Sequence, residues 1–413
     1  MALVDGYDDA GEPHAGQKEA VSILQSVLKD EPENSAANHY WIHAVEPGAK
    51  PEQALRSAEI LARLAPTSGH MVHMPGHIFY RTGDYAQAKT SFAASMQADE
   101  HYMQAQHMQV DDDWNYAHNL MYAIANLMEQ GQLREATELS GKLTAARGQL
   151  ESTLYPWSAR DGISRLHPRL PVALRKGDWG QVVELLNTSQ PPASLPNLVF
   201  LAKELMDFAT GMQALDLHDL NRAEESSARL DVELWRISQR LKDEAAVKDA
   251  KKEKANKTKP KLKVMPDALP QPLVDTLSIM SLELRAGVFI AKKQTEEAKK
   301  LFAQATQEEK ALGYHEPPGY IRPVAETEAA ALLMDEDWAG AKAAYQKSLV
   351  ERPLSGFALY GSAFSTERAG DVKAAAVEYA KFLTAWKNAD AGLAELAHAR
   401  EYLAQYGEVG SVN

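Results

Sequence analysis

The stretch GDYAQAKTSF, Gly83 to Phe92, contains the pattern that decides the fold. After a turn residue, an aromatic residue follows two positions later, a small one three further on and an aromatic one four after that. Related stretches recur along the chain: GQLREATELS from Gly131, GDWGQVVEL from Gly177, EDWAGAKAAY from Glu336 and GDVKAAAVEY from Gly370. Apolar residues three and four apart predict amphipathic helices, and recurrence of the stretch indicates structural repeats.

The interval between repeats is 34 residues where it is regular, as from Ala20 to Ala54 and on to Ala88. This pattern resembles the tetratricopeptide repeat (TPR), a helix-turn-helix unit whose small residue lets the second helix pack against the first. The resemblance implies an all-α solenoid, a right-handed superhelix of about nine partly degenerate repeats. Its expected small anchor residues are Ala20, Ala54, Ala88, Ala136, Val182, Ala223, Ala298, Ala341 and Ala375.

One segment interrupts the repeats. Residues 242–272 are rich in lysine, lack an apolar stripe after Val247 and end in three prolines, which predicts a helix that runs out into a disordered or solvated linker or loop. A nucleic-acid or lipid tether is the weaker interpretation, because no aromatic residues interleave the lysines. The predicted organisation is an N-terminal TPR block (1–241), this linker, and a C-terminal TPR block (273–413).

Composition narrows the class of protein. The net charge of −13 argues against nucleic acid as the main partner, and the absence of cysteine excludes disulfides and thiolate metal sites. No apolar run reaches the roughly 18 residues of a membrane helix. The N-terminus has no basic start and no apolar core of a signal peptide, so we expect a cytoplasmic protein, or a periplasmic one if a signal sequence is missing.

The histidines follow the repeat. HYWIH, from His39 to His43, and HMPGH, from His73 to His77, are the same His-x-x-x-His pair 34 residues apart. Residues four apart lie on one face of a helix. In the TPR resemblance this stripe lies on the first helix of each unit and faces the concave groove. Other residues at matching offsets are His70, His118, Glu46, Tyr80 and His167.

Two imidazoles one helical turn apart can share a metal ion, and neighbouring helices can each supply a pair. We therefore expect a transition-metal site (Zn, Cu or Fe) with His39, His43, His73 and His77 as principal ligands. Such a site would serve a metal-dependent hydrolase or oxidase. The open alternatives are a non-catalytic scaffold that binds a peptide or small polar ligand in the groove, and a purely structural cluster.

Two further segments supply candidates for ligand binding. DDDWNYAHN, Asp111 to Asn119, begins a predicted helix; Asp112 either caps it or completes a metal shell, and Asn115 lies one turn from His118. GYHEPPGYIRP, Gly313 to Pro323, predicts a stiff loop that either caps the preceding helix or brings Glu316 and Tyr320 over the groove.

A narrower resemblance rests on NHYWIHAVE, GHMVHMPGHIFYRTGDY and EPPGYIRP. These stretches are similar to a His-rich group of bacterial TPR proteins of unassigned function, so the resemblance implies a shared groove but no substrate. Relatives in that group tend to be longer at the N-terminus, and we expect this chain to open partway through a repeat.

Overall fold

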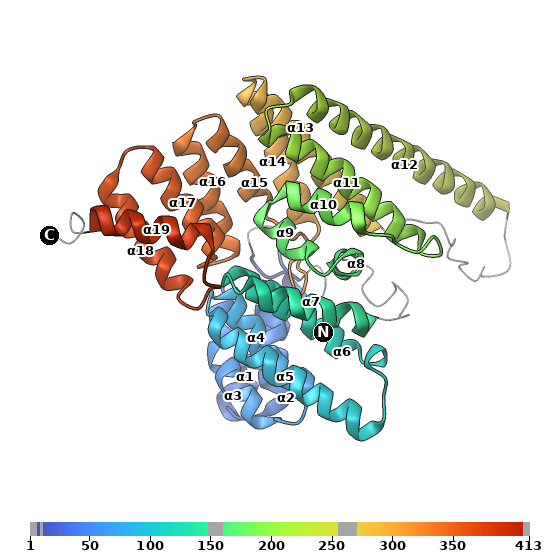
Figure 1. Cartoon of the computed structure of the whole chain (residues 1–413). Helices are drawn as coiled ribbons and strands as arrows, with labels where there is room; N and C mark the ends of the chain where they lie inside the picture. Colours follow the sequence, from blue (N-terminus) through green and yellow to red (C-terminus); the bar gives the residue numbers. More distant parts are fainter. Residues whose placement is uncertain (1–5, 9–10, 148–159, 255–270, 408–413) are drawn as a thin grey trace.

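The computed structural model describes residues 6–8, 11–147, 160–254 and 271–407, and these residues are arranged almost entirely as helices (Figure 1). The first part of the chain forms α1 (Ala15–Asp30), α2 (Ser35–Val45), η1 (Pro51–Ala54), α3 (Leu55–Leu64), α4 (Gly69–Arg81), α5 (Tyr85–Gln106), η2 (Val110–Asp112), α6 (Trp114–Glu129) and α7 (Leu133–Arg147). Within the described ranges the only β-type pairing is an isolated bridge between Tyr7 and Pro13.

The remaining helices follow the same alternation of helix and short turn. They are α8 (Arg160–Leu166), α9 (Leu170–Lys176), α10 (Trp179–Thr188), α11 (Pro196–Asp216), α12 (Leu220–Lys254), α13 (Gln271–Ala291), α14 (Thr295–Ala311), α15 (Val324–Met334), α16 (Trp338–Glu351), α17 (Gly356–Arg368), α18 (Val372–Ala385) and α19 (Ala394–Tyr406). Consecutive helices pack against each other in pairs. Among the described residues, every helix is too short or too polar to cross a membrane.

The recurring sequence stretch forms the turn within these helix pairs. Gly83 and Gly177 adopt left-handed backbone angles (φ of 81° and 71°), which end the preceding helix. The aspartate that follows each glycine caps the next helix: Asp84 accepts a hydrogen bond from the Gln87 amide, and Asp178 accepts one from Gln181. Each stretch therefore ends one helix and starts the next within two residues.

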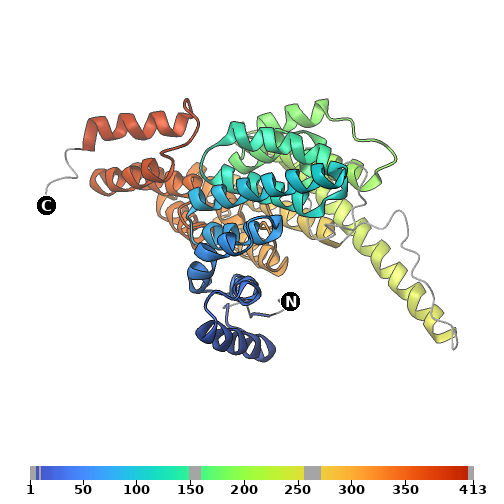
Figure 2. The ribbon, with the colours of Figure 1, turned by 90° about the horizontal axis from the view of Figure 1, so that it is seen from below.

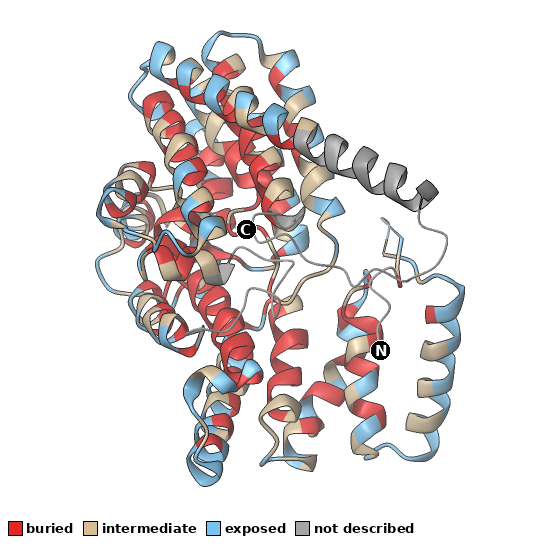
Figure 3. Cartoon of the chain, turned by 90° about the vertical axis from the view of Figure 1, so that its right-hand side faces the viewer, coloured by how far each residue is buried: buried red, intermediate tan, exposed pale blue. Residues whose placement is uncertain are grey.

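The small anchor residues lie where helices approach most closely. Ala54, Ala88, Ala136, Val182, Ala223, Ala298, Ala341 and Ala375 are all fully buried, whereas Ala20 is only partly buried. Figure 3 shows the buried residues gathered on the sides of the helices that face one another. One continuous hydrophobic core runs from α2 to α16, and a second cluster joins α17, α18 and α19.

Gly76 sets the distance between α4 and α5. A Cβ atom at this position would overlap the ring of Phe92. We expect Gly76→Ala to lower the free energy of unfolding by about 1–3 kcal/mol, because overpacking forces the helices apart. Urea titration followed by circular dichroism would measure the change.

Gly141 in α7 is the matched control, since nothing lies within 4 Å of a Cβ placed there. Gly141→Ala should leave stability unchanged or raise it by about 0.5–1 kcal/mol, as expected from helix propensity alone. Equal effects of the two variants would contradict the packing role of Gly76.

The helix expected to enter the predicted linker extends well into it. Helix α12 continues to Lys254, so residues 242–254 are helical, and residues 255–270 lie outside the described part of the chain. Helix α13 then packs against both α11 and α12, which continues the helix stacking across the predicted boundary. Lysine and glutamate are good helix formers, so a polar composition does not by itself end a helix.

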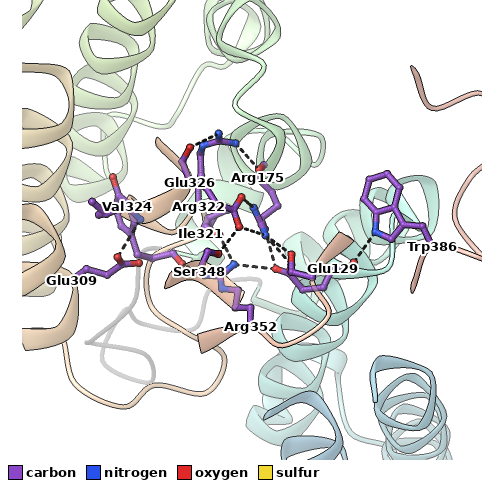
Figure 4. A network of polar contacts seen from close by, with 12 residues as sticks. Glu129, Arg175, Glu309, Ile321, Arg322, Val324, Glu326, Ser348, Arg352 and Trp386 are labelled. Atoms are coloured by element: carbon purple, nitrogen blue, oxygen red, sulfur yellow. Dashed lines mark hydrogen bonds and ion pairs between the residues drawn. The ribbon is translucent and has the colours of Figure 1, made fainter. Parts of the chain in front are cut away.

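A buried ionic network joins the two halves of the molecule (Figure 4). The Arg175 guanidinium of α9 binds the Glu129 carboxylate of α6 (Nη2–Oε2, 2.7 Å) and the Glu326 carboxylate of α15 (Nη1–Oε2, 2.5 Å). Arg352 also binds Glu129 (3.0 Å), and the Trp386 indole donates to the Glu129 carbonyl (2.9 Å). Two arginines thus balance two carboxylates, which is the condition for burying charge.

The same network fixes the loop between α14 and α15. Arg352 donates hydrogen bonds to the carbonyls of Tyr320 (2.8 Å) and Ile321 (2.9 Å), and Arg322 donates to the Arg175 carbonyl (3.2 Å). These contacts hold the end of segment 313–323 against the N-terminal half. Seen from below, the first helices of the chain, drawn in blue, project from the rest of the molecule (Figure 2).

Candidate metal centre

Three helices bring six histidines together. His39 and His43 lie on α2, His70, His73 and His77 lie on α4, and His118 lies on α6. Helix α4 contacts both α2 and α6, so it forms the middle of the cluster. We call these six side chains, with Glu46 and Glu316, the histidine centre.

The inner triad consists of His73, His77 and His118. Each residue offers one ring nitrogen, these three nitrogens lie within 4.8 Å of one another, and all three residues are buried. The shortest distance is 2.6 Å, between the Nε2 atoms of His73 and His77. Three imidazoles converging in this way can ligate one transition-metal ion.

The hydrogen bonds behind these rings determine which nitrogen carries a proton. The Asn119 side chain donates through Nδ2 to the Phe92 carbonyl (3.0 Å), so its Oδ1 faces His73 and accepts from His73 Nδ1 (2.8 Å). His77 Nδ1 donates to the Glu46 carboxylate (2.8 Å). In neutral His73 and His77 both Nε2 atoms therefore carry lone pairs, and they point at each other.

Two lone pairs at 2.6 Å repel unless a cation lies between them, and at this separation a proton fills that role. A metal ion would hold the two nitrogens farther apart, since Zn–N bonds of about 2.0–2.1 Å place tetrahedral ligands about 3.3 Å from each other. The pattern behind the rings, with each Nδ1–H bound to an amide or carboxylate oxygen, is the one that orients histidine ligands at metal sites.

The outer triad consists of His39, His43 and His70, which are all partly exposed. The Nε2 atoms of His39 and His70 are 3.0 Å apart. His43 Nδ1 donates to Glu46 Oε1 (3.1 Å), so its Nε2 is also available as a ligand. The two triads share Glu46, which accepts from one histidine of each.

Glu46 and Glu316 form a carboxyl pair at the centre. Glu46 is fully buried, and Glu316 Oε2 lies 3.8 Å from both His77 Nδ1 and His118 Nε2. Burial alone would raise the pKa of Glu46, but the adjacent His77 and His43 lower it below its usual range. Burial and the Glu46 charge raise the pKa of Glu316 well above its usual range. One carboxyl is thus ionised and the other holds a proton that a metal ion can replace.

Desolvation keeps most of the imidazoles neutral. Burial is the largest cause that lowers the pKa of His39 and His70 to about 4 and that of His118 to about 3, and neighbouring histidines lower them further. The pKa of His73 also lies well below its usual value for the same reasons. Neutral imidazole is the form that binds metal, so little competition from protons is expected near neutral pH.

Aromatic rings enclose the inner triad. Tyr122 packs on His77 with ring centroids 4.5 Å apart, and Phe92 packs on His73 at 5.1 Å. At the solvent side, Trp114 lies near both His70 and His118, and its side chain is 52% exposed. The inner triad is therefore dry, whereas the outer triad reaches the surface.

Of the residues expected to bind a ligand, Glu46, His70, His118 and Glu316 lie in the histidine centre. Asn115 lies behind it: its amide interacts with His70 and donates to Asp99 (2.9 Å). Tyr80 is also one layer out, with its buried ring packed on Tyr122 and Tyr85.

Three expected residues lie elsewhere. His167 falls in the turn between α8 and α9, because α8 ends at Leu166, and its Nδ1 accepts from the Arg169 amide. Asp112 is exposed in η2, and the neighbouring Asp113 caps α6. Tyr320 turns toward α13 and donates to Glu283 (2.5 Å).

Asn119 and Tyr122 complete the centre but were not expected from the sequence. Tyr122 lies one turn after His118 on α6, so the signal for it was the continuation of the His118 face along the helix. Asn119 directly follows His118 on another face, and nothing in the spacing singled it out. Neither comparison with protein-family models nor comparison with curated proteins gives a match to this chain.

Proposed function

We propose that this is a TPR-type helical-repeat protein that binds a transition-metal ion at the inner triad. The observation that carries the proposal is the convergence of ring nitrogens of His73, His77 and His118 within 4.8 Å, with Nδ1 of His73 and of His77 hydrogen-bonded to an oxygen acceptor. The turns and buried anchor residues described above support the repeat assignment, and its superhelical form remains part of the proposal.

A metal ion satisfies more of the centre than a proton does. A proton between His73 and His77 serves only two of the three converging imidazoles. His73, His77 and His118 would together hold a divalent ion, with Glu316 close by, and this set matches the ligands of zinc and non-haem iron sites. Burial also disfavours an imidazolium more than a neutral, metal-bound ring.

The chemistry open to such an ion follows from its ligands. Three histidines with a remaining position suit activation of water for hydrolysis, and two histidines with a carboxylate suit iron or copper oxidation. The protein's own groups would then act around it: Glu46 orients His43 and His77, and Glu316 accepts or donates a proton at the edge of the triad.

A second candidate is a non-catalytic scaffold that binds a peptide or small polar ligand. The observation in its favour is the solvent side of the outer triad, where the side chains of Tyr40 and Trp114 are 50% and 52% exposed. Exposed aromatic residues beside polar groups are typical of recognition surfaces.

Metal analysis of the untagged protein tests the proposal. We expect about one equivalent of zinc, copper or iron after dialysis against metal and then buffer, and a Co²⁺-loaded form with the visible absorption of four- or five-coordinate cobalt. The control is a His14→Ala/His101→Ala variant, because both histidines are exposed and lie outside the centre. This variant should retain the full metal content.

The absence of bound metal after reconstitution would overturn the proposal and leave a proton between His73 and His77. Retention of metal at the same level after both inner and outer triads have been replaced would also overturn it. In either case the scaffold candidate would be tested next by binding of acidic and basic peptide pools.

A further inference from the structure

A second site lies far from the histidine centre, in a cavity of about 380 Å³ between α11, α13 and α15. Most of its wall is apolar and comes from Met212, Leu215, Ile290, Phe302, Ala331 and Met334. This volume is within the range of cavities that hold small organic ligands. Such walls offer water few hydrogen bonds, so an apolar occupant fits better than a cluster of water.

One acidic side chain reaches this cavity from the core. Glu283 of α13 lines it and is 1% exposed. Its Oε2 accepts from the Tyr320 hydroxyl (2.5 Å), but among the described residues Oε1 has no hydrogen bond of normal geometry. The Thr327 hydroxyl, which also lines the cavity, interacts with the Glu283 carboxyl, but in a geometry too poor to satisfy either atom fully. A buried polar atom without a good hydrogen bond costs free energy. A ligand that donates a hydrogen bond to Glu283 Oε1 would therefore be stabilised.

The entrance of the cavity carries partial negative charge. Helices α11, α13 and α15 all end there, at Asp216, Ala291 and Met334, and their carbonyl ends carry partial negative charge. Asp216 and Asp335 add two carboxylates; Lys293 binds Asp335 (2.6 Å), and Arg322 and His218 lie near Asp216. Because these charges largely offset one another, the preference of the entrance for a cation rests on the three helix ends.

The cavity is elongated along α13. Glu283 and Ala291 are eight residues apart on this helix, which corresponds to about 12 Å at the helical rise per residue. A ligand must therefore be long and narrow, with a charged or donor group at the deep end.

We propose that this cavity binds a small amphipathic amine, whose ammonium group donates to Glu283 and whose hydrocarbon chain packs against the apolar wall. Ammonium to carboxylate is a charge-assisted hydrogen bond, the strong kind in a dry site. The proposal is independent of the metal centre, and no residue of that centre lines this cavity.

The test is isothermal calorimetry of the full chain with n-octylamine, n-octanol and n-octanoate at about pH 8.5. Burial raises the pKa of Glu283 to about 7. A pH of about 8.5 lies above this value, so the carboxyl is mostly ionised in the experiment. We expect n-octylamine to bind at least about tenfold more tightly than n-octanol, and n-octanoate to bind most weakly.

Two variants and one control locate the binding. Glu283→Gln keeps the shape and removes the charge, so amine affinity should fall at least about tenfold while octanol affinity changes little. Ala331→Leu fills part of the cavity and should weaken both ligands. Glu204→Gln, a buried carboxyl on α11 that does not line the cavity, should behave as the wild type.

Equal affinity for amine and alcohol would overturn the proposal, as would an unchanged affinity in Glu283→Gln. No binding of any probe would mean that the cavity holds only water, which also overturns it. Circular dichroism on each variant shows that a lost signal reflects the site and not unfolding.

Discussion

A His73→Ala/His118→Ala variant is expected to bind zinc or cobalt on the order of a thousandfold more weakly than the wild-type protein. Both substitutions remove imidazoles of the inner triad, and only His77 of that triad remains. Loss of groups that merely orient metal ligands already costs about 10- to 100-fold, so loss of two ligands should cost more. Competition with a chromophoric chelator would measure the two affinities.

The matched control is His39→Ala/His70→Ala, which removes two histidines of the outer triad and leaves the inner one intact. We expect this variant to retain the tightly bound ion. The wild type should also gain thermal stability on adding metal, because an ion that binds only the folded state shifts the unfolding equilibrium, and the inner-triad variant should lose this gain. Equal metal affinity in the two double variants would contradict the assignment of the inner triad.

Arg175→Ala is expected to lower the free energy of unfolding by about 3–5 kcal/mol. The guanidinium is fully buried and binds Glu129 and Glu326, which come from different parts of the chain. Its removal leaves two buried carboxylates with only Arg352 nearby. Burial by itself would raise the pKa of Glu129, and Arg175 with Arg352 instead holds it at about 2. Urea unfolding at neutral pH would measure the loss.

Arg229→Ala is the control for this effect. Arg229 binds Asp207 (2.6 Å) at the surface, where its side chain is 48% exposed, and such a pair contributes at most about 1 kcal/mol. A similar loss for Arg175→Ala and Arg229→Ala would contradict the role of the buried network.

The local features of this structure follow from the sequence. The turn stretches such as Gly83–Phe92 form a helix end, a cap and the start of the next helix, because these depend on residues a few positions apart. Equal offsets from buried anchors place the two histidine pairs on neighbouring helices. The four residues expected to share one ion are, however, divided between two triads, His39 and His43 with His70, and His73 and His77 with His118.

The features that the sequence did not indicate depend on long-range geometry or on helix length. The ion pair of Arg175 with Glu326 spans 151 residues, and no periodic pattern encodes which helices meet across that distance. His167 has a matching offset, but α8 is short and leaves it in a turn. The sequence also left open where the helix entering residues 242–272 ends, and α12 extends to Lys254, as the helix propensity of lysine and glutamate allows.

The contacts of Glu129 limit which insertions and deletions of helical hairpins this chain can tolerate. Open arrays of helical hairpins tolerate the gain or loss of a unit, because each unit touches only its neighbours. Here Glu129 bonds to Arg352 and Trp386, and Gly131 accepts from the Asp390 amide (3.0 Å). Deleting or duplicating one hairpin between these positions would move the bonded partners apart. The number of hairpins is thereby fixed, and we expect insertions to be tolerated only in surface turns.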